Sequence, residues 1–277
     1  MSLVFRRLSL GVVLGAWALS IGGAGGVALA DDAKAREALQ KGRDLYAQRE
    51  DLAKIDEAIK ILAEAETAAA KSEDTDLKYD ILIAHGRAIY YKGVHTTGDK
   101  NKIPLFEAAY GKSKAAKELS DDYADGYFYY GVALARWAEA KGVLESLNRK
   151  KELFENMEGA MERDTREAKA GDSIDGYGPN RVIGRAYFKL PVFAGGNRGK
   201  ALENLKKAVD GAPNFVLNTI YYAETLYDGD AAEKKQACEL LDNLLKKNPA
   251  EIDPNRVPES KEEFVDAQKL RSEMKCK

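Results

Sequence analysis

Apolar residues along most of the chain recur at three- and four-residue spacing, which is the pattern of amphipathic helices. From Asp32 to Lys277 the sequence is rich in Ala, Leu, Glu and Lys, and no segment alternates apolar and polar residues long enough to predict a strand. The pattern predicts an all-α chain of about eleven helices, the last at roughly 259–275. Clusters of turn-forming residues interrupt it at 72–76, 93–104, 120–125, 170–179, 190–199, 210–214, 228–230 and 248–258.

Four glycines occupy the same place within similar segments, which read KGRDLY, HGRAIY, YGVALA and IGRAYF. They are Gly42, Gly86, Gly131 and Gly184, and they are spaced by 44, 45 and 53 residues. A glycine inside a helix costs about 1 kcal/mol relative to alanine. Its repetition at one position predicts that each of these glycines lets another helix pack closely, as in a stack of helical repeats.

The helix after a repeated glycine carries a second pattern. In 201–213 and 237–249 an alanine is followed after 4, 3 and 5 positions by a leucine, a small or apolar residue and a proline. The pattern recurs without the proline at 58–65 and more weakly at 109–116. Together with the glycines, this order resembles the tetratricopeptide repeat, a unit of two helices. The resemblance implies about five helix pairs in a right-handed solenoid, with the last helix as a polar cap.

A narrower resemblance lies between residues 177 and 224. Its features are Tyr177-Gly178-Pro179, Gly184, Leu190-Pro191, Gly195-Gly196, Lys200-Ala201-Leu202-Glu203 and Tyr222-Ala223-Glu224. These features are similar to those of the T-component family of tetratricopeptide-associated TRAP transporters. The resemblance implies an exported, non-enzymatic helper in solute uptake that binds a periplasmic solute-binding protein and a small organic acid or lipid, and it implies a homotrimer.

The first thirty residues are typical of a secretory signal peptide. Arg6 and Arg7 precede a long uncharged stretch, and an Ala-Leu-Ala sequence ending at Ala30 offers a cleavage site. Cleavage predicts a soluble protein in the periplasm. The alternative is a retained membrane anchor, since the uncharged stretch is long enough to cross a bilayer. The first cysteine of the chain is Cys238, so the usual lipoprotein anchor is not expected.

Residues 31–277 are predicted to form one domain of 247 residues with a formal charge near −4. This charge, without a separate basic arm, argues against nucleic-acid binding. The domain contains two cysteines, Cys238 and Cys276. They can form a disulfide in an oxidising compartment, or Cys238 can be a buried thiol while Cys276 is free at the chain end. The sequence leaves both arrangements open.

The arginine and the aromatic residue that follow the repeated glycines are candidate binding residues. Residues three apart share a helix face, and in tetratricopeptide stacks this face lines the concave groove. An arginine on an aromatic ring keeps its donors available for a carboxylate. We expect a groove for an anionic or amphiphilic ligand or an acidic partner segment, unless the arginines pair with the chain's own carboxylates. The candidate groove residues are Arg43, Tyr46, Arg87, Tyr90, Tyr91, Phe128, Arg136, Arg181, Arg185, Phe188 and Lys189.

Candidate residues for catalysis are few. His85 precedes Gly86 on an apolar helix, which favours a hydrogen-bonded core histidine, and His95 lies in a predicted polar loop. No spacing of His, Cys or Asp indicates a metal site, and the glycine-rich segment 194–201 lacks required residues of a phosphate loop. The sequence predicts a binding protein without a cofactor. An envelope-assembly scaffold that binds peptide segments is the alternative.

Overall fold

The structure is a computed structural model of the chain and describes residues 25–163, 165 and 173–276. The described residues contain no β-strand, so the predicted all-α class is confirmed. Their eleven α-helices agree with the predicted number. The helices are α1 (Gly25–Ala47), α2 (Leu52–Ala68), α3 (Thr75–Val94), α4 (Asp99–Leu119), α5 (Ala124–Lys141), α6 (Val143–Met161), α7 (Ile174–Lys189), α8 (Arg198–Gly211), α9 (Val216–Tyr227), α10 (Ala231–Leu245) and α11 (Val257–Glu273).

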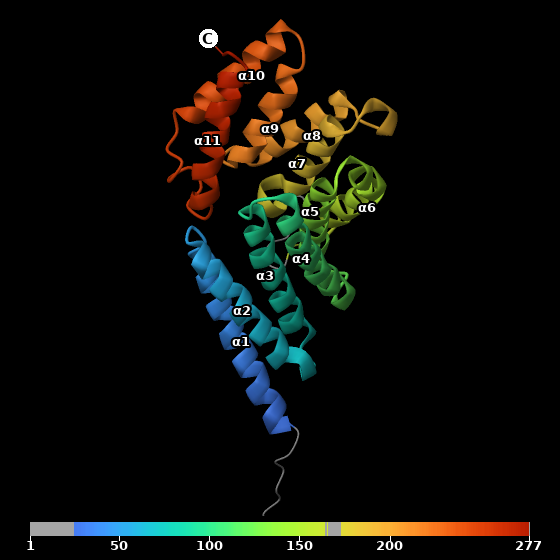
Figure 1. The fold of residues 1–277 in the computed structure, drawn as a ribbon, viewed down its shortest axis with the longest axis vertical. Helices are drawn as coiled ribbons and strands as arrows, with labels where there is room; N and C mark the ends of the chain where they lie inside the picture. The colour runs from blue at the N-terminus through green and yellow to red at the C-terminus, as the bar shows by residue number, and fades with distance from the viewer. Residues whose placement is uncertain (1–24, 164, 166–172, 277) are drawn as a thin grey trace, which may run out of the picture.

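The first ten helices pack as five neighbouring pairs. Each odd-numbered helix from α1 to α9 contacts the even-numbered helix that follows it, and each pair contacts the next pair along the chain. The pairs form an elongated stack with α1 and α2 towards one end and α10 at the other (Figure 1). Helix α11 packs on α9 and α10, and its first turn lies near the turn between α1 and α2 (Figure 1).

The four repeated glycines lie where paired helices touch, as predicted. A side-chain carbon at Gly42 would lie 2.5 Å from Leu62, and one at Gly184 would lie 2.7 Å from Leu205. Such distances are far below van der Waals contact, so no larger residue fits without a shift of the partner helix. Gly86 and Gly131 make equivalent close approaches to α4 and α6.

The small and large residues of the second pattern form the core. The alanines and leucines of α8 that lie at the repeated positions 201, 205 and 208 are fully buried, and so are those of α2 at 58, 62 and 65. The equivalent residues of α10 are 3% exposed or less. These side chains fill the space between neighbouring helices, so the repeated positions describe the core-facing stripe of α2, α8 and α10.

Four helices begin at side chains that accept hydrogen bonds from the free N–H groups of the first turn. Asp51, Asp74 and Asn197 do so at α2, α3 and α8. At α10, Asp230 and Glu233 form a reciprocal capping box. The polar interruptions of the apolar pattern therefore start helices as well as separate them.

Several helix boundaries differ from the predicted interruptions, and the turn at 48–51 between α1 and α2 lies in none of them. Gly142 alone separates α5 from α6, with a φ of 113° that favours glycine, and no cluster of turn residues marks it. Conversely, α4 begins at Asp99, inside the predicted interruption 93–104, and contains Pro104 in its second turn. The helix tolerates Pro104 because a proline so near the helix start removes only one helical hydrogen bond.

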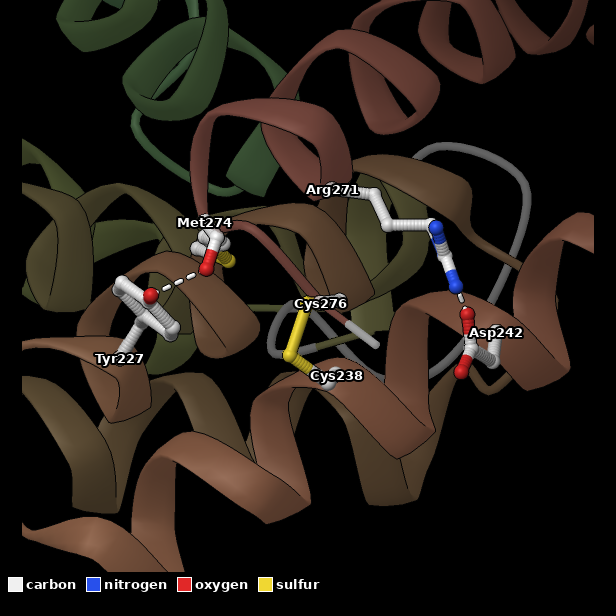
Figure 2. The surroundings of a disulfide bond; sticks show 6 residues. All are labelled: Tyr227, Cys238, Asp242, Arg271, Met274 and Cys276. Carbon is white, nitrogen blue, oxygen red and sulfur yellow. Dashed lines mark hydrogen bonds and ion pairs between the residues drawn. A yellow bond between two sulfur atoms is a disulfide. The ribbon is translucent and has the colours of Figure 1, made fainter.

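The two cysteines form a disulfide that holds the C-terminal end of the chain (Figure 2). Cys276, just after α11, is bonded to Cys238 in α10, with 5.5 Å between their Cα atoms. Nearby, the Tyr227 hydroxyl donates to the Met274 carbonyl, and Arg271 pairs with Asp242 (Figure 2). The pairing decides between the two arrangements that the sequence left open.

Helix α11 differs from the polar end cap that was expected at 259–275. Phe264, Ala267 and Met274 join the apolar cluster of α9 and α10. Its other side faces the inner surface of the stack, and Arg49 in the turn between α1 and α2 pairs with Glu259. Helix α11 does cover the last pair, as a cap would, but it also contacts the first pair, which the sequence pattern did not predict.

The predicted signal peptide falls mainly on residues 1–24, which lie outside the described residues. The predicted cleavage site after Ala30 lies within α1. Among the helices of the described part of the chain, none is both long enough and apolar enough to cross a membrane.

Candidate functional site

The inner sides of α1, α3, α5, α7 and α9 face α11 across a cavity of about 1240 Å³. Ten of the eleven candidate groove residues line this cavity. They come together because each occupies the same helix face in its own repeat, and the helix pairs stack with that face inward. The ten residues are Arg43, Tyr46, Arg87, Tyr90, Tyr91, Phe128, Arg136, Arg181, Arg185 and Lys189.

Phe188 is the candidate that does not line the cavity. Its half-buried ring lies beside the cations of Arg185 and Lys189, at 5.9 Å and 5.2 Å from the ring centre. Those two cations extend towards α9, where both pair with Glu224. Phe128 does line the cavity, but it is only 1% exposed and serves as part of the apolar wall.

Several of the arginines predicted to bind a ligand form ion pairs within the protein. Arg43 lies 3.5 Å from Asp80 and keeps 46% of its side chain exposed. Arg136 lies 3.1 Å from Glu139, and Tyr90 is the main group that raises the pKa of Arg136. Arg185 is paired as well. For these three arginines the contacts agree with the second possibility stated from the sequence, that the arginines pair with the chain's own carboxylates.

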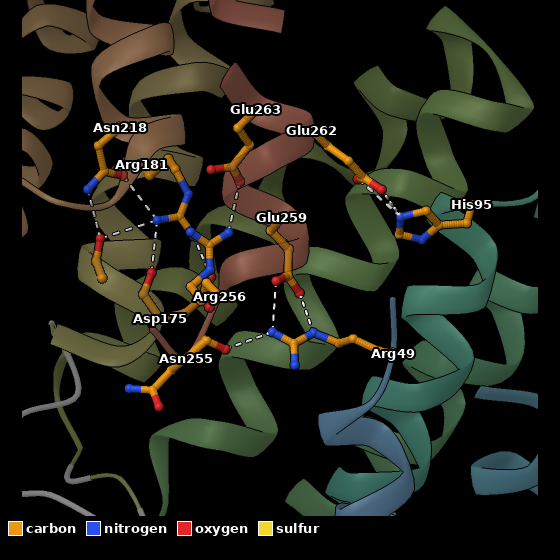
Figure 3. Close-up of polar contacts among 11 residues, drawn as sticks. Arg49, His95, Asp175, Arg181, Asn218, Asn255, Arg256, Glu259, Glu262 and Glu263 are labelled. Atoms are coloured by element: carbon orange, nitrogen blue, oxygen red, sulfur yellow. Dashed lines mark hydrogen bonds and ion pairs between the residues drawn. The ribbon is translucent and has the colours of Figure 1, made fainter. Parts of the chain in front are cut away.

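Arg181 supports an unusual backbone turn in the cavity wall. Asp175, Gly176 and Tyr177 adopt left-handed φ angles of 51°, 63° and 59° before the regular part of α7. Arg181 donates to the carbonyls of Asp175 and Gly176 at 2.9 and 3.2 Å and to the Asn218 side chain at 3.0 Å (Figure 3). Left-handed residues other than glycine persist only where the surroundings hold them. The guanidinium of Arg181 is therefore engaged in holding this turn.

Arg87 differs from the other cavity arginines because it forms no ion pair with any carboxylate of the described residues. Its guanidinium lies between two aromatic rings, 5.3 Å from the centre of Tyr46 and 5.0 Å from that of Tyr129. The side chain is half-buried and lines the cavity. Tyr129 is one of the cavity residues that the repeat pattern missed, since only its place in the aromatic run 127–130 marks it.

At neutral pH Arg87 is charged and the two tyrosines beside it keep their protons. Burial is the main cause that raises the pKa of Tyr129 and of Tyr46, and the nearby Arg87 opposes the rise. Tyr129 is the main group that raises the pKa of Arg87. At neutral pH the cluster therefore combines a fixed positive charge with two neutral phenols, which are rings for stacking and hydroxyls for hydrogen bonding.

An apolar wall completes the cavity. It is formed by side chains of α5, α7 and α9, with Ile174 at the start of α7. The wall consists of Phe128, Val132, Ile174, Val182, Leu217 and Ile220. A cavity with an apolar wall and a cation that no carboxylate of the described residues pairs matches a molecule that has an anionic group on an apolar body.

The two histidines are occupied in other ways. His85 is 5% exposed and hydrogen-bonded to Glu66, as predicted for a core histidine. His95 ends α3 and lies 3.0 Å from Glu262 of α11. In the described part of the chain, no group of three or more His, Cys, Asp or Glu side chains is placed to hold a metal ion.

No family model matches this chain, and no curated protein matches it either. The tetratricopeptide and T-component resemblances therefore stay predictions based on the quoted residues. The site is characterised by its own geometry, which is a central cavity where Arg87 lies between two tyrosines without an ion pair to the described residues.

Proposed function

We propose that the protein is an exported, non-enzymatic binding protein of the tetratricopeptide type, and that its central cavity holds an organic anion with an apolar body. The observation that carries the proposal is Arg87, which lies in the cavity between two tyrosine rings without an ion pair to the described residues. The apolar wall of α5, α7 and α9 supplies the surface for the rest of the ligand.

The free energy for anion binding comes from the surroundings of Arg87. Charged hydrogen bonds contribute about 1.5–3 kcal/mol each, and the attraction between charges is stronger in a partly enclosed cavity than in water. Tyr46 and Tyr129 hold the guanidinium in place, so less side-chain entropy is lost on binding. The other cavity arginines are balanced by carboxylates and contribute less to this attraction.

Anilinonaphthalene sulfonate, a fluorescent aromatic anion, is a suitable probe for the cavity. We expect Arg87→Met to weaken its binding by about tenfold or more, as loss of one charged hydrogen bond implies. Arg43→Gln is the matched control, since Arg43 occupies the same repeat position but is exposed and pairs with Asp80. Equal binding by wild type and Arg87→Met would refute the proposed site.

We also propose that the protein acts in the periplasm with the solute-binding protein of a TRAP-type transporter and so aids solute uptake. The support for this partner is the resemblance at 177–224, a segment that forms α7, α8 and most of α9. Affinity capture from a periplasmic extract is expected to recover a solute-binding protein. Recovery of none would count heavily against this partner.

The alternative role, an envelope-assembly scaffold, predicts different occupants for the cavity. Native mass spectrometry of the purified protein separates the two roles. A retained organic acid or lipid supports the ligand-binding role. Retained peptides, with no effect of organic anions on their binding, would favour the scaffold.

A further inference from the structure

The two ends of the helix stack touch each other, which a linear stack of repeats does not require. In such stacks each repeat contacts only its neighbours. Here α11 and the residues just before it reach the turn between α1 and α2 and the end of α3 through side-chain ion pairs and one hydrogen bond from Arg49 to a backbone carbonyl (Figure 3). We call these contacts the clasp. Its residues are Arg49, Glu50 and His95 on one side and Asn255, Glu259, Lys261 and Glu262 on the other.

Arg49 is the centre of the clasp. It is 7% exposed and donates to both carboxylate oxygens of Glu259, at 2.6 and 2.7 Å, and to the Asn255 carbonyl at 2.8 Å. Its guanidinium also lies 5.1 Å from the ring centre of Tyr46. A paired, two-pronged contact of this kind is the strongest type of ion pair in proteins.

The outer contacts of the clasp are more exposed. Lys261 lies 2.7 Å from Glu50, and both side chains are about half exposed or more. His95 lies 3.0 Å from Glu262. Exposed ion pairs contribute little free energy and weaken as salt increases. The clasp is therefore a strong inner contact surrounded by weak ones.

No apolar cluster of the described residues spans the clasp. The apolar residues of α11 belong to the cluster that includes α9 and α10, and those of α1 belong to a separate cluster with α2 and α3. The disulfide fixes the end of α11 to α10. Helix α11 is thus a firm part of the C-terminal end of the stack, and polar contacts alone join it to the N-terminal end.

The clasp residues also line the cavity. Arg49, His95, Asn255, Glu259 and Glu262 all face it. We propose that the clasp is the gate of the cavity: the two ends of the stack separate at these ion pairs to admit a ligand and close again over it. This inference rests on the proposed function, because it assigns a route of entry to the same cavity.

The separation can be measured without any ligand. Spin labels at Lys60→Cys on α2 and Lys235→Cys on α10 report the distance between the two ends, because both positions are exposed and the native cysteines are already paired. We expect Arg49→Gln to shift the distance distribution to longer values, and molar salt to do the same in wild type. Arg36→Gln is the control, since Arg36 on α1 pairs with Asp74 away from the clasp. It should leave the distances unchanged.

The route of entry is tested by binding kinetics. A bismaleimide bridge between Glu50→Cys and Lys261→Cys holds the clasp shut, and we expect it to slow both association and dissociation of anilinonaphthalene sulfonate, because the two ends can no longer separate. Unbridged Arg49→Gln should accelerate both rates. If Arg49→Gln proves poorly folded, the bridged protein and the salt series still decide the question.

The outcomes separate the gate from the binding role. Distances that are the same in wild type and Arg49→Gln, at low and high salt, would overturn the gate even if the probe binds. Equal probe kinetics in bridged and unbridged protein would overturn it as well. Shifted distances without any probe binding would support the clasp as the opening joint and count against the proposed function.

Discussion

The helix contact at Gly184 leads to a quantitative test of the stack. In Gly184→Ala the new carbon would lie 2.7 Å from Cγ of Leu205 and 3.1 Å from the Ala201 carbonyl oxygen. Leu205 is fully buried and the carbonyl belongs to the backbone of α8, so neither can move freely. Gly111 on α4 is the matched control, because it is exposed and has no atom within 4 Å of the position of an added carbon.

The two substitutions share the gain in helix propensity and differ in the cost of overpacking. Each replaces a mid-helix glycine by alanine, which stabilises the helix by about 1 kcal/mol. Only Gly184→Ala overpacks a core, which costs about 1–3 kcal/mol. We therefore expect Gly111→Ala to raise the free energy of unfolding, and Gly184→Ala to lie about 1–3 kcal/mol below it.

Thermal unfolding followed by circular dichroism measures this difference. For a chain of this size, 1–3 kcal/mol corresponds to a difference in Tm of roughly 2–12 °C between the two variants. An equal rise in Tm for Gly184→Ala and Gly111→Ala would show that the glycine is not needed for helix approach. The argument for the repeated glycines would then fail.

Two further predictions concern the ends of the stack. Cys238→Ser should lower the free energy of unfolding by about 4 kcal/mol, the loop-closure value for a separation of 38 residues. Calorimetry of wild type and variant measures this difference, and an unchanged Tm would contradict it. Burial alone would raise the pKa of Glu259, but the hydrogen bond and the charge of Arg49, with smaller contributions from a backbone hydrogen bond and Arg256, together outweigh it, so the net pKa is lowered. The pair therefore stabilises the fold above the ordinary glutamate pKa, and this contribution is lost as pH falls through the lowered value. Between about pH 5 and pH 3 the Tm of wild type should fall more steeply than that of Arg49→Gln, and parallel curves would contradict the pairing.

Much of the fold follows from patterns within single helices. The three- and four-residue spacing of apolar positions predicts helices, and the glycine at one register predicts where they touch. Both predictions hold because helix geometry repeats every few residues, so neighbours along the chain decide which side of a helix is buried. The boundary at Gly142 was missed because a single glycine with a positive φ makes the turn without other turn residues.

The sequence predicts which residues share the surface of the candidate site, but it does not predict which of their charges are paired. The register places Arg43, Arg87 and Arg185 on the same face, and the structure brings all three to the cavity. Which of them is balanced depends on partners from other helices, such as Glu224, which lies 39 residues from Arg185. A sequence pattern carries no information on such distant contacts.

The helical class, the faces that pack and the residues that turn inward follow from the amino-acid pattern, because these depend on local periodicity. Three features emerge only from the folded chain: Arg87 lacks an ion pair to the described residues, Cys238 and Cys276 are paired, and α11 lies against Arg49 across 210 residues of chain. Those features arise when distant segments meet, and their positions depend on the small rotations between successive helix pairs accumulated over the whole stack.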